Sequence, residues 1–495
     1  MSRAPTRERH PVHRYGAGIY LPPRRPESRC VPLQPVPPPD LLYNPPRTIT
    51  CEANNMPTIL ERFYETHQKS AELYAGGQEV VAGGAAQSRV MYPHPFYVGR
   101  GDGAVKWDVD GNELIDYLIG FGSLILGNNR PEITEAVERQ VRNGTHMGTT
   151  TPHEVRWAEL ITGLMPSAER VRFTASGTEA TLLAIRLARG YTGKTRLVKF
   201  REHYDGWHDY VAIEAGITAP YGVPNETRST VAVVEPDPDA LEKYLSQDSD
   251  VAAVIMEPTG AHWGQFPVQN PHFLESVREI TQRHGVLMIM DEVIMGFRVS
   301  RGGAQGKYGV MPDLCSMAKI VAGGLPGGAV GGRADIFEPM GDPDPAKRFV
   351  HPGTFNANPV SAVAGIAALE IIESEPITEM ADAAADRLKN GLRNALTKQE
   401  VTGHVHGVSS IVHIALGVEG ETNDQDISQV PHDQLMAATS GRKIEMLKLA
   451  MLNEGVDMFG GIGFMTSAAH TDDQVDRTVE AFERSLVALR DEGYI

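Results

Sequence analysis

The middle of the chain alternates short apolar runs with stretches of helical periodicity. A helix is predicted over 271–284, because Asn270 can cap its first turn, Pro271 suits that turn and Gly285 can end it. Apolar strands separated by helices predict a largely parallel sheet covered by helices on both faces. The predicted strands are Val171–Thr174, Arg196–Phe200, Thr230–Val234, Val251–Met256 and Val286–Met290.

Longer helical patterns lie on either side of this α/β region. The N-terminal side has an amphipathic pattern over Met56–Ala75, and Val105–Val109 followed by Asp110-Gly111 is typical of a hairpin. The C-terminal side predicts a second, smaller α+β domain around a strand-like stretch, Val408–Leu416. Its predicted helices cover 360–374, 431–454 and 472–490.

The first 55 residues have a different composition. They are rich in proline and arginine, and Pro37-Pro38-Pro39 favours polyproline II, so we expect residues 1–55 to be a disordered extension. A targeting peptide is the alternative, but the segment has no apolar secretory stretch and its prolines would break a transit helix. The predicted domains are then 56–104 (an N-terminal helix and part of the small domain), 105–350 (the large domain), 351–390 (a connecting helix) and 391–495 (the C-terminal small domain).

Composition narrows the class of protein. The 495 residues contain 46 Lys and Arg against 63 Asp and Glu, a net charge of −17, which disfavours a main role in binding nucleic acid or an anionic membrane. Three cysteines are too few for a disulfide framework and indicate a reducing compartment, so we expect a cytoplasmic protein. No apolar run is long enough for a membrane-spanning helix.

Polar residues follow the predicted strands where those strands end. Ligands of open α/β sheets bind beyond the carboxyl ends of the strands, so these residues are candidates for one site. The candidates are Asp291, Glu257, the turn Ser176-Gly177-Thr178, and Lys319 after the apolar stretch Leu314–Met317. The turn opens a helix whose free N–H groups suit a phosphate, although Ser176 and Glu179 also fit a capping box that needs no ligand.

Together these residues are the parts that pyridoxal phosphate requires. A helix N-terminus binds the phosphate, a carboxylate keeps the pyridine nitrogen protonated so that the ring accepts electrons, and a lysine forms the Schiff base. Taken singly, Asp291 could cap a helix and Lys319 could reach solvent. Their combination with the phosphate-binding turn predicts a cofactor site.

Several stretches resemble the class III aminotransferases of fold type I, and the resemblance covers the chain from about residue 57 to 495. The matching stretches are SGTEATLLAIRLARGYTG (176–193), YDGWHD (204–209), MDEVIMGFR (290–298), AKIVAGGLPGGAVGG (318–332) and GTFNANP (353–359). The resemblance implies a large pyridoxal-phosphate-binding domain with a smaller domain beside it. It also implies a homodimer with shared active sites.

The resemblance assigns roles to individual residues. Lys319 would form the Schiff base, Asp291 would pair with the ring nitrogen and Tyr204 would stack on the ring. Ser176, Gly177 and Thr178 would lie at the phosphate, and Thr354 would reach the phosphate of the neighbouring subunit. Glu257 corresponds to the family's glutamate beside the cofactor, and His262 lies in a loop near the ring hydroxyl.

Within the family, the chain is most similar to glutamate-1-semialdehyde aminomutases and the amino-acid transaminases related to them, and GFMTSAAHT (463–471) supports that placement. Three positions depart from the aminomutase pattern. Gly461 replaces a glutamate, Gly120-Phe121-Gly122-Ser123 replaces a small-Trp-Gly-Pro loop, and Asp205 replaces the histidine of a Tyr-His-Gly stretch. The first two changes alter the substrate pocket.

Arg89 is the candidate for binding a substrate carboxylate. Related amino-acid and β-amino-acid transaminases place an arginine near this point, and a guanidinium can bind a carboxylate with two hydrogen bonds. The alternative is a surface arginine in a loop. No arginine lies between Gly455 and His470, where many relatives have a second one.

The sequence thus predicts a transaminase that moves an amino group from an amino acid, including a β-amino acid, or an amine to a keto acid through Lys319 and the pyridoxamine form. An aminomutase or a racemase with the same cofactor is the alternative within the family. A P-loop phosphotransferase built on Gly193-Lys194-Thr195 is a remote alternative, because Ala188 stands where the first P-loop glycine is needed. A degenerate binding protein that has lost its activity is a further alternative, but such a protein would not need the full set of site residues. A zinc site at His404 and His406 is disfavoured, because the sequence has no further ligands at metal spacing.

Overall fold

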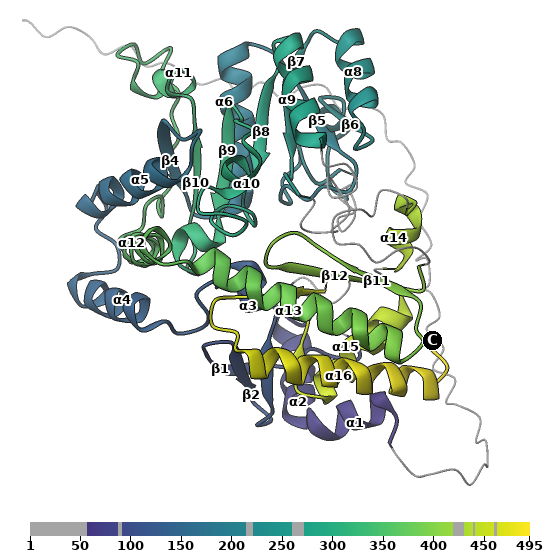
Figure 1. Cartoon of the computed structure of the whole chain (residues 1–495). Coiled ribbons are helices and arrows are strands. Elements are labelled where there is room, and N and C mark those ends of the chain that lie inside the picture. Colours follow the sequence, from purple (N-terminus) through teal and green to yellow (C-terminus); the bar gives the residue numbers. More distant parts are fainter. Residues whose placement is uncertain are drawn as a thin grey trace, which may run out of the picture. The chain divides into compact units, whose positions relative to one another are not determined.

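The computed structural model describes residues 57–495 except 88–91, 214–220, 260–271, 419–429, 439–440 and 460–462. Met56–Ile495 forms one compact unit. Its largest sheet has seven strands in the order β4-β10-β9-β8-β7-β5-β6, in the upper half of the view in Figure 1. The strands are β4 (Arg170–Thr174), β5 (Arg196–Phe200), β6 (Val231–Val234), β7 (Val251–Met256), β8 (Leu287–Asp291), β9 (Leu314–Ala318) and β10 (Gly328–Gly332).

The large sheet is mostly parallel, as the sequence predicts. Strands β6, β5, β7, β8 and β9 pair in parallel, whereas β10 is antiparallel to both of its neighbours, β9 and β4. The carboxyl ends of β4, β7, β8 and β9 therefore lie at one edge of the sheet. The side-chain candidates that follow these strands are brought to that edge.

The alternation of side chains along the strands explains why helices cover both faces. In β8, Leu287 and Ile289 pack with residues of α6 (Gly177–Thr192), whereas Met288 and Met290 pack with residues of α8 (Pro238–Gln247) and α9 (Phe273–His284). Helix α9 confirms most of the helix predicted over 271–284, and Gly285 ends it with φ +61°. Asn270 and Pro271 lie outside the described residues.

Two smaller sheets complete the part of the chain that is described. The first contains β1 (Val98–Asp102), β2 (Val105–Asp108), β3 (Glu113–Asp116) and β13 (Val456–Asp457), so a strand near the C-terminus extends the predicted hairpin. The second contains β11 (Gly403–His406), β12 (Ile411–Leu416) and β14 (Phe464–Met465). The segments that precede the large sheet in the sequence share one apolar core with the segments that follow it. This core includes Phe63, Leu114, Leu388, Leu447 and Phe482.

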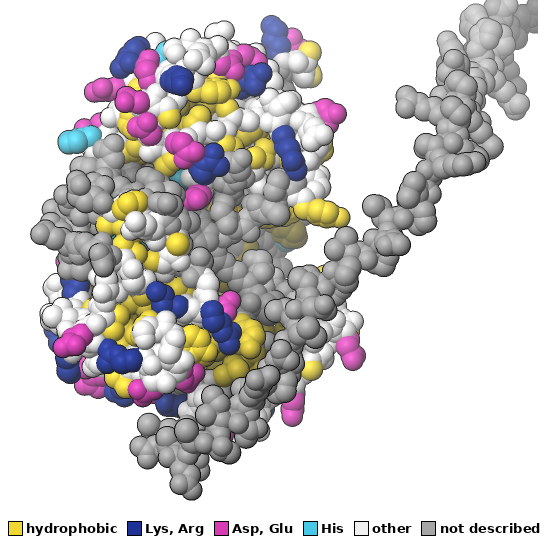
Figure 2. Space-filling view, turned by 90° about the vertical axis from the view of Figure 1, so that its right-hand side faces the viewer, with side chains coloured by type: hydrophobic (Ala, Val, Ile, Leu, Met, Phe, Trp, Pro, Cys, Tyr) yellow, Lys and Arg dark blue, Asp and Glu magenta, His cyan; other side chains and the backbone are white. Residues whose placement is uncertain are grey.

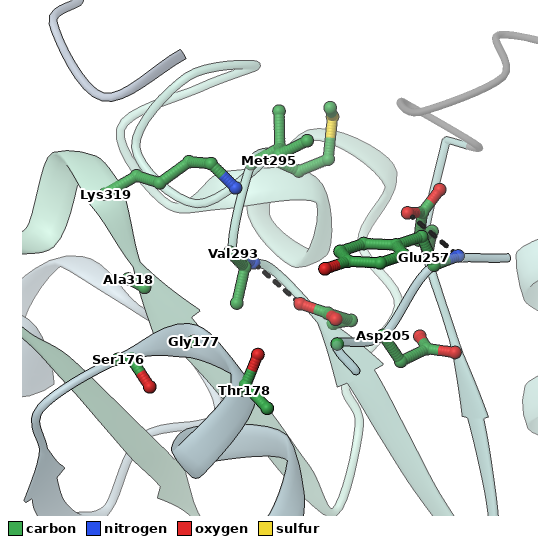
Figure 3. Close-up of a pocket in the computed structure, with 13 residues that line it drawn as sticks. Ser176, Gly177, Thr178, Asp205, Glu257, Val293, Met295, Ala318 and Lys319 are labelled. Carbon is green, nitrogen blue, oxygen red and sulfur yellow. Dashed lines mark hydrogen bonds between the residues drawn. The ribbon is translucent and has the colours of Figure 1, made fainter. Parts of the chain in front are cut away.

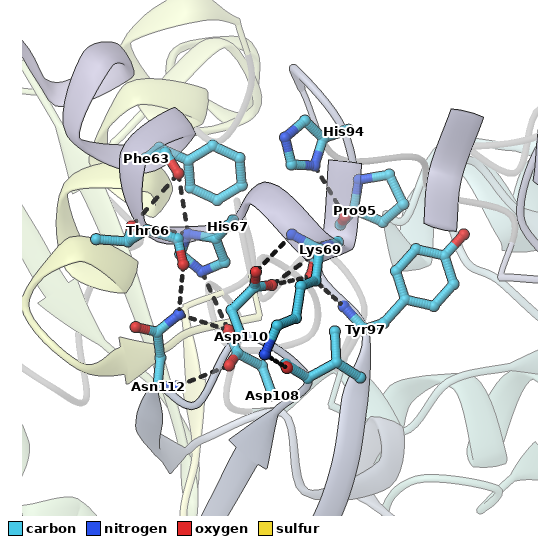
Figure 4. Close-up of polar contacts among 12 residues, drawn as sticks. Phe63, Thr66, His67, Lys69, His94, Pro95, Tyr97, Asp108, Asp110 and Asn112 are labelled. Carbon is cyan, nitrogen blue, oxygen red and sulfur yellow. Dashed lines mark hydrogen bonds and ion pairs between the residues drawn. The ribbon is translucent and has the colours of Figure 1, made fainter. Parts of the chain in front are cut away.

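The N-terminal helix predicted over Met56–Ala75 is two helices, α1 (Ile59–Thr66) and α2 (Gln68–Val80). His67 separates them with φ −130° and ψ 41°, outside the helical region. The first turn of α2 is capped from the hairpin, because Asp110 accepts hydrogen bonds from Lys69 N at 2.7 Å and Ser70 N at 3.1 Å (Figure 4). A continuous helix would need no cap at this point. Because the chain breaks at His67, the free N–H groups at the start of α2 need acceptors, and Asp110 supplies them from a distant part of the sequence.

The C-terminal helices confirm two predictions and correct a third. Helix α12 (Pro359–Ser374) and α16 (Asp472–Asp491) match the predicted ranges. The single helix predicted over 431–454 is wrong, since the structure has α14 (His432–Ala438) and α15 (Arg442–Asn453). Gly441 precedes α15 with φ +83°, a conformation that ends helical geometry.

Helix α13 (Ile377–Lys398) is the longest described helix, and it follows α12 after a break at Pro376. The remaining helical segments are α3 (Ile119–Gly122), α4 (Pro131–Asn143), α5 (Pro152–Leu164), α7 (Asn225–Arg228), α10 (Gly303–Tyr308), η1 (Lys319–Ala322), α11 (Ala334–Phe337) and η2 (Glu338–Gly341). Among the helices in the described ranges, none has the length and apolar character needed to cross a membrane. Basic and acidic side chains are interspersed on the described part of the face in Figure 2.

Candidate active site

A cavity lies at the carboxyl edge of the large sheet, where the sequence predicts the site (Figure 3). It brings together residues from four strand ends and from the loop after β5. Its lining residues are Ser176, Gly177, Thr178, Tyr204, Asp205, Gly206, Glu257, Asp291, Val293, Ile294, Met295, Ala318 and Lys319. The residues predicted for the cofactor site are all in this set except Thr354 and His262.

The first turn of α6 forms one wall of the cavity. Ser176 is the N-cap of α6, and its side chain accepts a hydrogen bond from Glu179 N at 3.2 Å. The Glu179 carboxylate accepts from Ala175 N at 2.6 Å, so a local capping arrangement is present. A side chain at Gly177 would place its Cβ 3.0 Å from both methyl groups of Val293, which leaves room there only for backbone. The turn therefore offers backbone N–H groups to an anion at close range.

Lys319 follows β9 directly in the sequence, and its side chain points into the cavity, toward Met295 and Val293 (Figure 3). Its backbone has φ +56°, an uncommon conformation for a residue with a side chain. Burial lowers the pKa of its ammonium to about 8, against the opposing effects of Asp291 and Glu257. A larger fraction of the amine is therefore neutral at physiological pH than in an ordinary lysine.

Asp291 is the last residue of β8 and is 6% exposed. Its Oδ1 accepts hydrogen bonds from Val293 N at 2.9 Å and from Ser316 Oγ at 3.1 Å. Burial raises the pKa of the Asp291 carboxyl well above its usual range, and the neighbouring carboxyl of Asp205 raises it further. A cation next to Asp291 would offset that cost, because an opposite charge favours the ionised carboxylate.

The loop after β5 supplies a second group of site residues. The backbone N–H of Tyr204 donates to Glu257 Oε1 at 3.3 Å, and Glu257 itself is 4% exposed. Gly206 has φ +114°, and a Cβ on it would lie 3.0 Å from Thr178 Oγ1. A glycine is thus required for this loop to pass against the first turn of α6.

Thr354 lies elsewhere in this chain. It lines a second cavity together with His146, Arg172 and Asn356, and its carbonyl oxygen accepts a hydrogen bond from His146 Nε2 at 2.7 Å. The predicted role of Thr354 concerns a neighbouring subunit, and it stays a prediction. Arg89, His262 and Gly461 lie outside the described residues.

Three residues that matter to the site were not selected from the sequence. Ser316 donates to Asp291 from β9, and Val293 closes over Gly177. Asp205 lines the cavity and is 1% exposed, yet from sequence it is only a departure from a family motif. One signal for its importance is present in the sequence, which is that an acidic residue replaces a histidine in a motif that otherwise matches the family.

The residues present fit pyridoxal phosphate. The N-terminus of α6 can hold a phosphate. Both hydrogen bonds to the Asp291 carboxyl end on Oδ1, so Oδ2 can face the ring nitrogen. Lys319 brings an amine with a lowered pKa into the same cavity. Among the described residues, no group of three His, Cys, Asp or Glu side chains could hold a metal ion.

Comparisons with known proteins agree with this geometry. The sequence model of the aminotransferase class-III family matches residues 86–486. The glutamate-1-semialdehyde 2,1-aminomutase of Sulfurisphaera tokodaii is 37% identical over 426 residues, which cover 84% of this chain and 97% of that protein.

Solved structures with a similar fold include transaminases. An omega-transaminase from Sphaerobacter thermophilus is 34% identical with a TM-score of 0.77, and the match covers 85% of this chain and 98% of that one. A transaminase with pyridoxal phosphate bound is 32% identical, also with a TM-score of 0.77, and the match covers 87% and 99% of the two chains.

Proposed function

The chain belongs to the class-III aminotransferase family, and from this premise we propose that it is a transaminase that moves an amino group from an amino acid or amine to a keto acid. It is an enzyme, and its cofactor is pyridoxal 5'-phosphate. The aminomutase reaction is the alternative on the same scaffold. The choice between them concerns the walls of the substrate pocket, because both reactions use the same cofactor residues.

One observation favours a transaminase. In α3, Gly120-Phe121-Gly122 takes positive φ angles throughout, and the Phe121 ring packs edge-on against Phe459 at 5.5 Å between ring centroids. Aminomutases have a small-Trp-Gly-Pro loop at this point and a glutamate at the position of Gly461. A smaller aromatic ring in place of the tryptophan, and a glycine in place of the glutamate, support a pocket shaped for another substrate.

The cofactor, when bound, supplies an electron sink for the bond to the substrate α-hydrogen. Asp291 Oδ2 would hold a proton on the ring nitrogen, and Tyr204 would cover the ring. Gly177 and Thr178 would bind the phosphate through the N-terminus of α6. Lys319 Nζ would take a proton from the substrate carbon and return it, a role that suits an amine whose pKa is lowered to about 8.

The requirement for a second substrate tests this proposal. We expect steady turnover of an amino donor only when a keto acid is supplied, with equal amounts of the two products formed. An aminomutase would convert glutamate-1-semialdehyde without a keto acid. Steady conversion of that compound alone, with no exchange of amino groups with added keto acids, would contradict the proposal.

We also propose that Arg89 binds the substrate carboxylate. In that case Arg89→Ala should lose most activity toward an amino acid but keep it toward an uncharged amine of the same shape, because a charge-assisted pair contributes about 2–3 kcal/mol. Lysine should rescue only partly, since it cannot form two parallel hydrogen bonds. An equal fall in kcat/KM for both substrates would show that Arg89 has another role.

The proposed assembly is a homodimer in the cytoplasm. Apolar side chains around the second cavity support a partner there: Phe355 and Val350 are each 59% exposed and Met147 is 44% exposed. Such a group of apolar side chains marks an interaction surface more often than a free one. A second copy that covered this surface would bring Thr354 close to another subunit.

A further inference from the structure

Asp205 is held in one position by the segments around it. Its carbonyl oxygen accepts a hydrogen bond from Thr181 Oγ1 of α6 at 2.6 Å, and the next residue, Gly206, lies against Thr178. The side chain is 1% exposed and lines the same cavity as Asp291. Both the backbone and the side chain of Asp205 are therefore fixed by buried contacts.

The two aspartates differ in their hydrogen bonds. Asp291 receives two donors, whereas neither carboxyl oxygen of Asp205 has a hydrogen-bond partner among the described residues. An ionised carboxylate that is buried without donors is far more costly than a neutral acid in the same place. Burial raises the pKa of Asp291 as well, but its two donors and a protonated ring nitrogen would favour its ionised form, so with the cofactor bound Asp205 is the one suited to carry a proton.

The charged groups around Asp205 reinforce this difference. Lys199 of β5, Glu257 after β7 and Asp291 of β8 face it. Lys199 Nζ donates to backbone carbonyl oxygens, including those of His203 at 3.0 Å and Ile213 at 3.1 Å. Its charge lowers the pKa of Asp205, but burial dominates and Glu257 adds to it, so that the pKa is raised to about 7.

The nearby His208 does not titrate near neutral pH. His208 reaches Thr181 Oγ1 through Nε2 at 3.2 Å, and burial lowers its pKa to about 4, so it is neutral. Lys319 faces Asp291 and opposes its protonation. A protonated ring nitrogen would act in the same direction.

We propose that, with the cofactor bound, Asp205 carries a proton on the acid side of neutral pH, next to an ionised Asp291, and that loss of this proton as the pH rises adds a second negative charge beside the cofactor ring. Asp205 is thus a positioning residue that adjusts the electronic state of the bound cofactor with pH. The inference rests on the proposed pairing of Asp291 with the ring nitrogen. It gives this chain an acid that becomes negative on losing its proton where the family has a histidine, which becomes neutral.

The test follows the visible absorbance of the cofactor-loaded enzyme from pH 5.5 to pH 9, without substrate. The wild type should show a spectral step near pH 7. Asp205→Asn should lose the step and keep the wild-type low-pH spectrum throughout, because an amide has the shape of the neutral acid and cannot ionise. Asp209→Asn, an exposed residue of the same loop, is the control and should keep the step.

A second measurement on the loaded enzyme detects the proton itself and does not rely on the colour of the cofactor. Infrared difference spectra between low and high pH should show the C=O stretch of protonated carboxyl groups in the wild type. One component should be lost in Asp205→Asn, whereas that of Glu292, whose pKa burial raises to about 7, should remain. A step that persists unchanged in Asp205→Asn, or a wild type with neither a step nor an Asp205 band in this pH range, would overturn the proposal. Neither measurement involves a substrate, so failure of the transaminase proposal would be seen separately, in the requirement for a keto acid.

Discussion

Arg298 Nη2 donates a hydrogen bond of 2.6 Å to the carbonyl oxygen of Gly122, which ties the segment after β8 to the turn of α3. The same guanidinium donates through Nη1 to Ser410 Oγ at 3.0 Å and to the Thr466 carbonyl oxygen at 3.2 Å. Arg298 is fully buried, and burial lowers its pKa to about 10. One side chain thus joins the large sheet, the three-stranded sheet and the turn that we assign to the substrate pocket.

Replacing Arg298 with Met should destabilise the protein by about 2–4 kcal/mol, because three buried acceptors lose their donor. The melting temperature should fall, and KM for the substrate should rise as the α3 turn loses its anchor. Arg301→Ala is a matched control, since Arg301 lies in the same segment and donates to two carbonyl oxygens but is exposed. Equal melting temperatures for the two variants would contradict the anchoring role.

Lys319 should react as an amine of low basicity. The neutral amine is the nucleophile, so the rate of cofactor attachment to the cofactor-free enzyme should rise with pH to half of its maximum near pH 8, the lowered pKa of Lys319. Borohydride treatment of the loaded enzyme should label this residue, and Lys319→Ala should abolish both the label and turnover. A label on a different lysine would remove the assignment.

Asp291→Asn should lower kcat strongly and leave the fold intact. An amide keeps the shape of the side chain but loses the charge that holds a proton on the ring nitrogen, so kcat should fall roughly 100-fold or more, as for loss of a preorganised charge. Circular dichroism should be unchanged. Activity within a factor of a few of the wild type would refute the role of Asp291.

The central part of the site could be predicted because the chemistry lies at the ends of apolar strands. Asp291 and Lys319 each follow a run of buried residues, and a parallel sheet brings such ends to one edge. Ser316 could not be selected in the same way, because it is a small polar residue inside a buried strand. Its role depends on the register of β8 and β9, which pairs Asp291 with Ser316.

Strand β10 shows what the apolar pattern cannot reveal. Its sequence, Gly-Ala-Val-Gly-Gly, has little strand propensity. The sheet nevertheless requires small residues there, because a Cβ at Gly331 would lie 2.9 Å from Ala168 Cβ and 3.2 Å from Cys315 Sγ. Tertiary packing therefore overrides local preference. The break at His67 is similar, since the cap of α2 comes from Asp110, about 40 residues away.

The buried Lys106 offers a test of stability against pH. Lys106 Nζ contacts Asp116 at 2.9 Å and also Asp457, so one cation from β2 is shared by carboxylates of β3 and β13. Burial alone would raise the pKa of Asp116, but Lys106 and hydrogen bonds bring it below the ordinary value. The wild type therefore loses this contribution to stability as the pH falls through the lowered pKa.

Lys106→Met should destabilise the protein by about 3–5 kcal/mol at pH 7, because it leaves the buried Asp116 carboxylate without its cation and leaves Asp457 with Lys448 at 4.0 Å. The pKa of Asp116 should then rise, so the variant should gain stability as the pH falls from 7 toward 5, opposite in sign to the wild-type contribution. Adding Asp116→Asn and Asp457→Asn should restore part of the loss. Urea unfolding at pH 5 and pH 7 measures both effects, and parallel pH profiles for the wild type and Lys106→Met would contradict the shared-cation interpretation.

The proposed sharing of active sites makes a quantitative prediction. If Thr354 serves the partner's phosphate site, Lys319→Ala and Thr354→Ala should each be strongly impaired alone. In a hybrid of the two, one site would combine both defects, whereas the other would have an intact Lys319 and an intact Thr354. Random exchange of equal amounts should then restore up to about a quarter of the wild-type activity, since half of the dimers are hybrids with one working site each. If Thr354 served its own subunit, every site would keep one defect and mixing would restore nothing. A fully active monomer in analytical ultracentrifugation would remove the basis of the experiment.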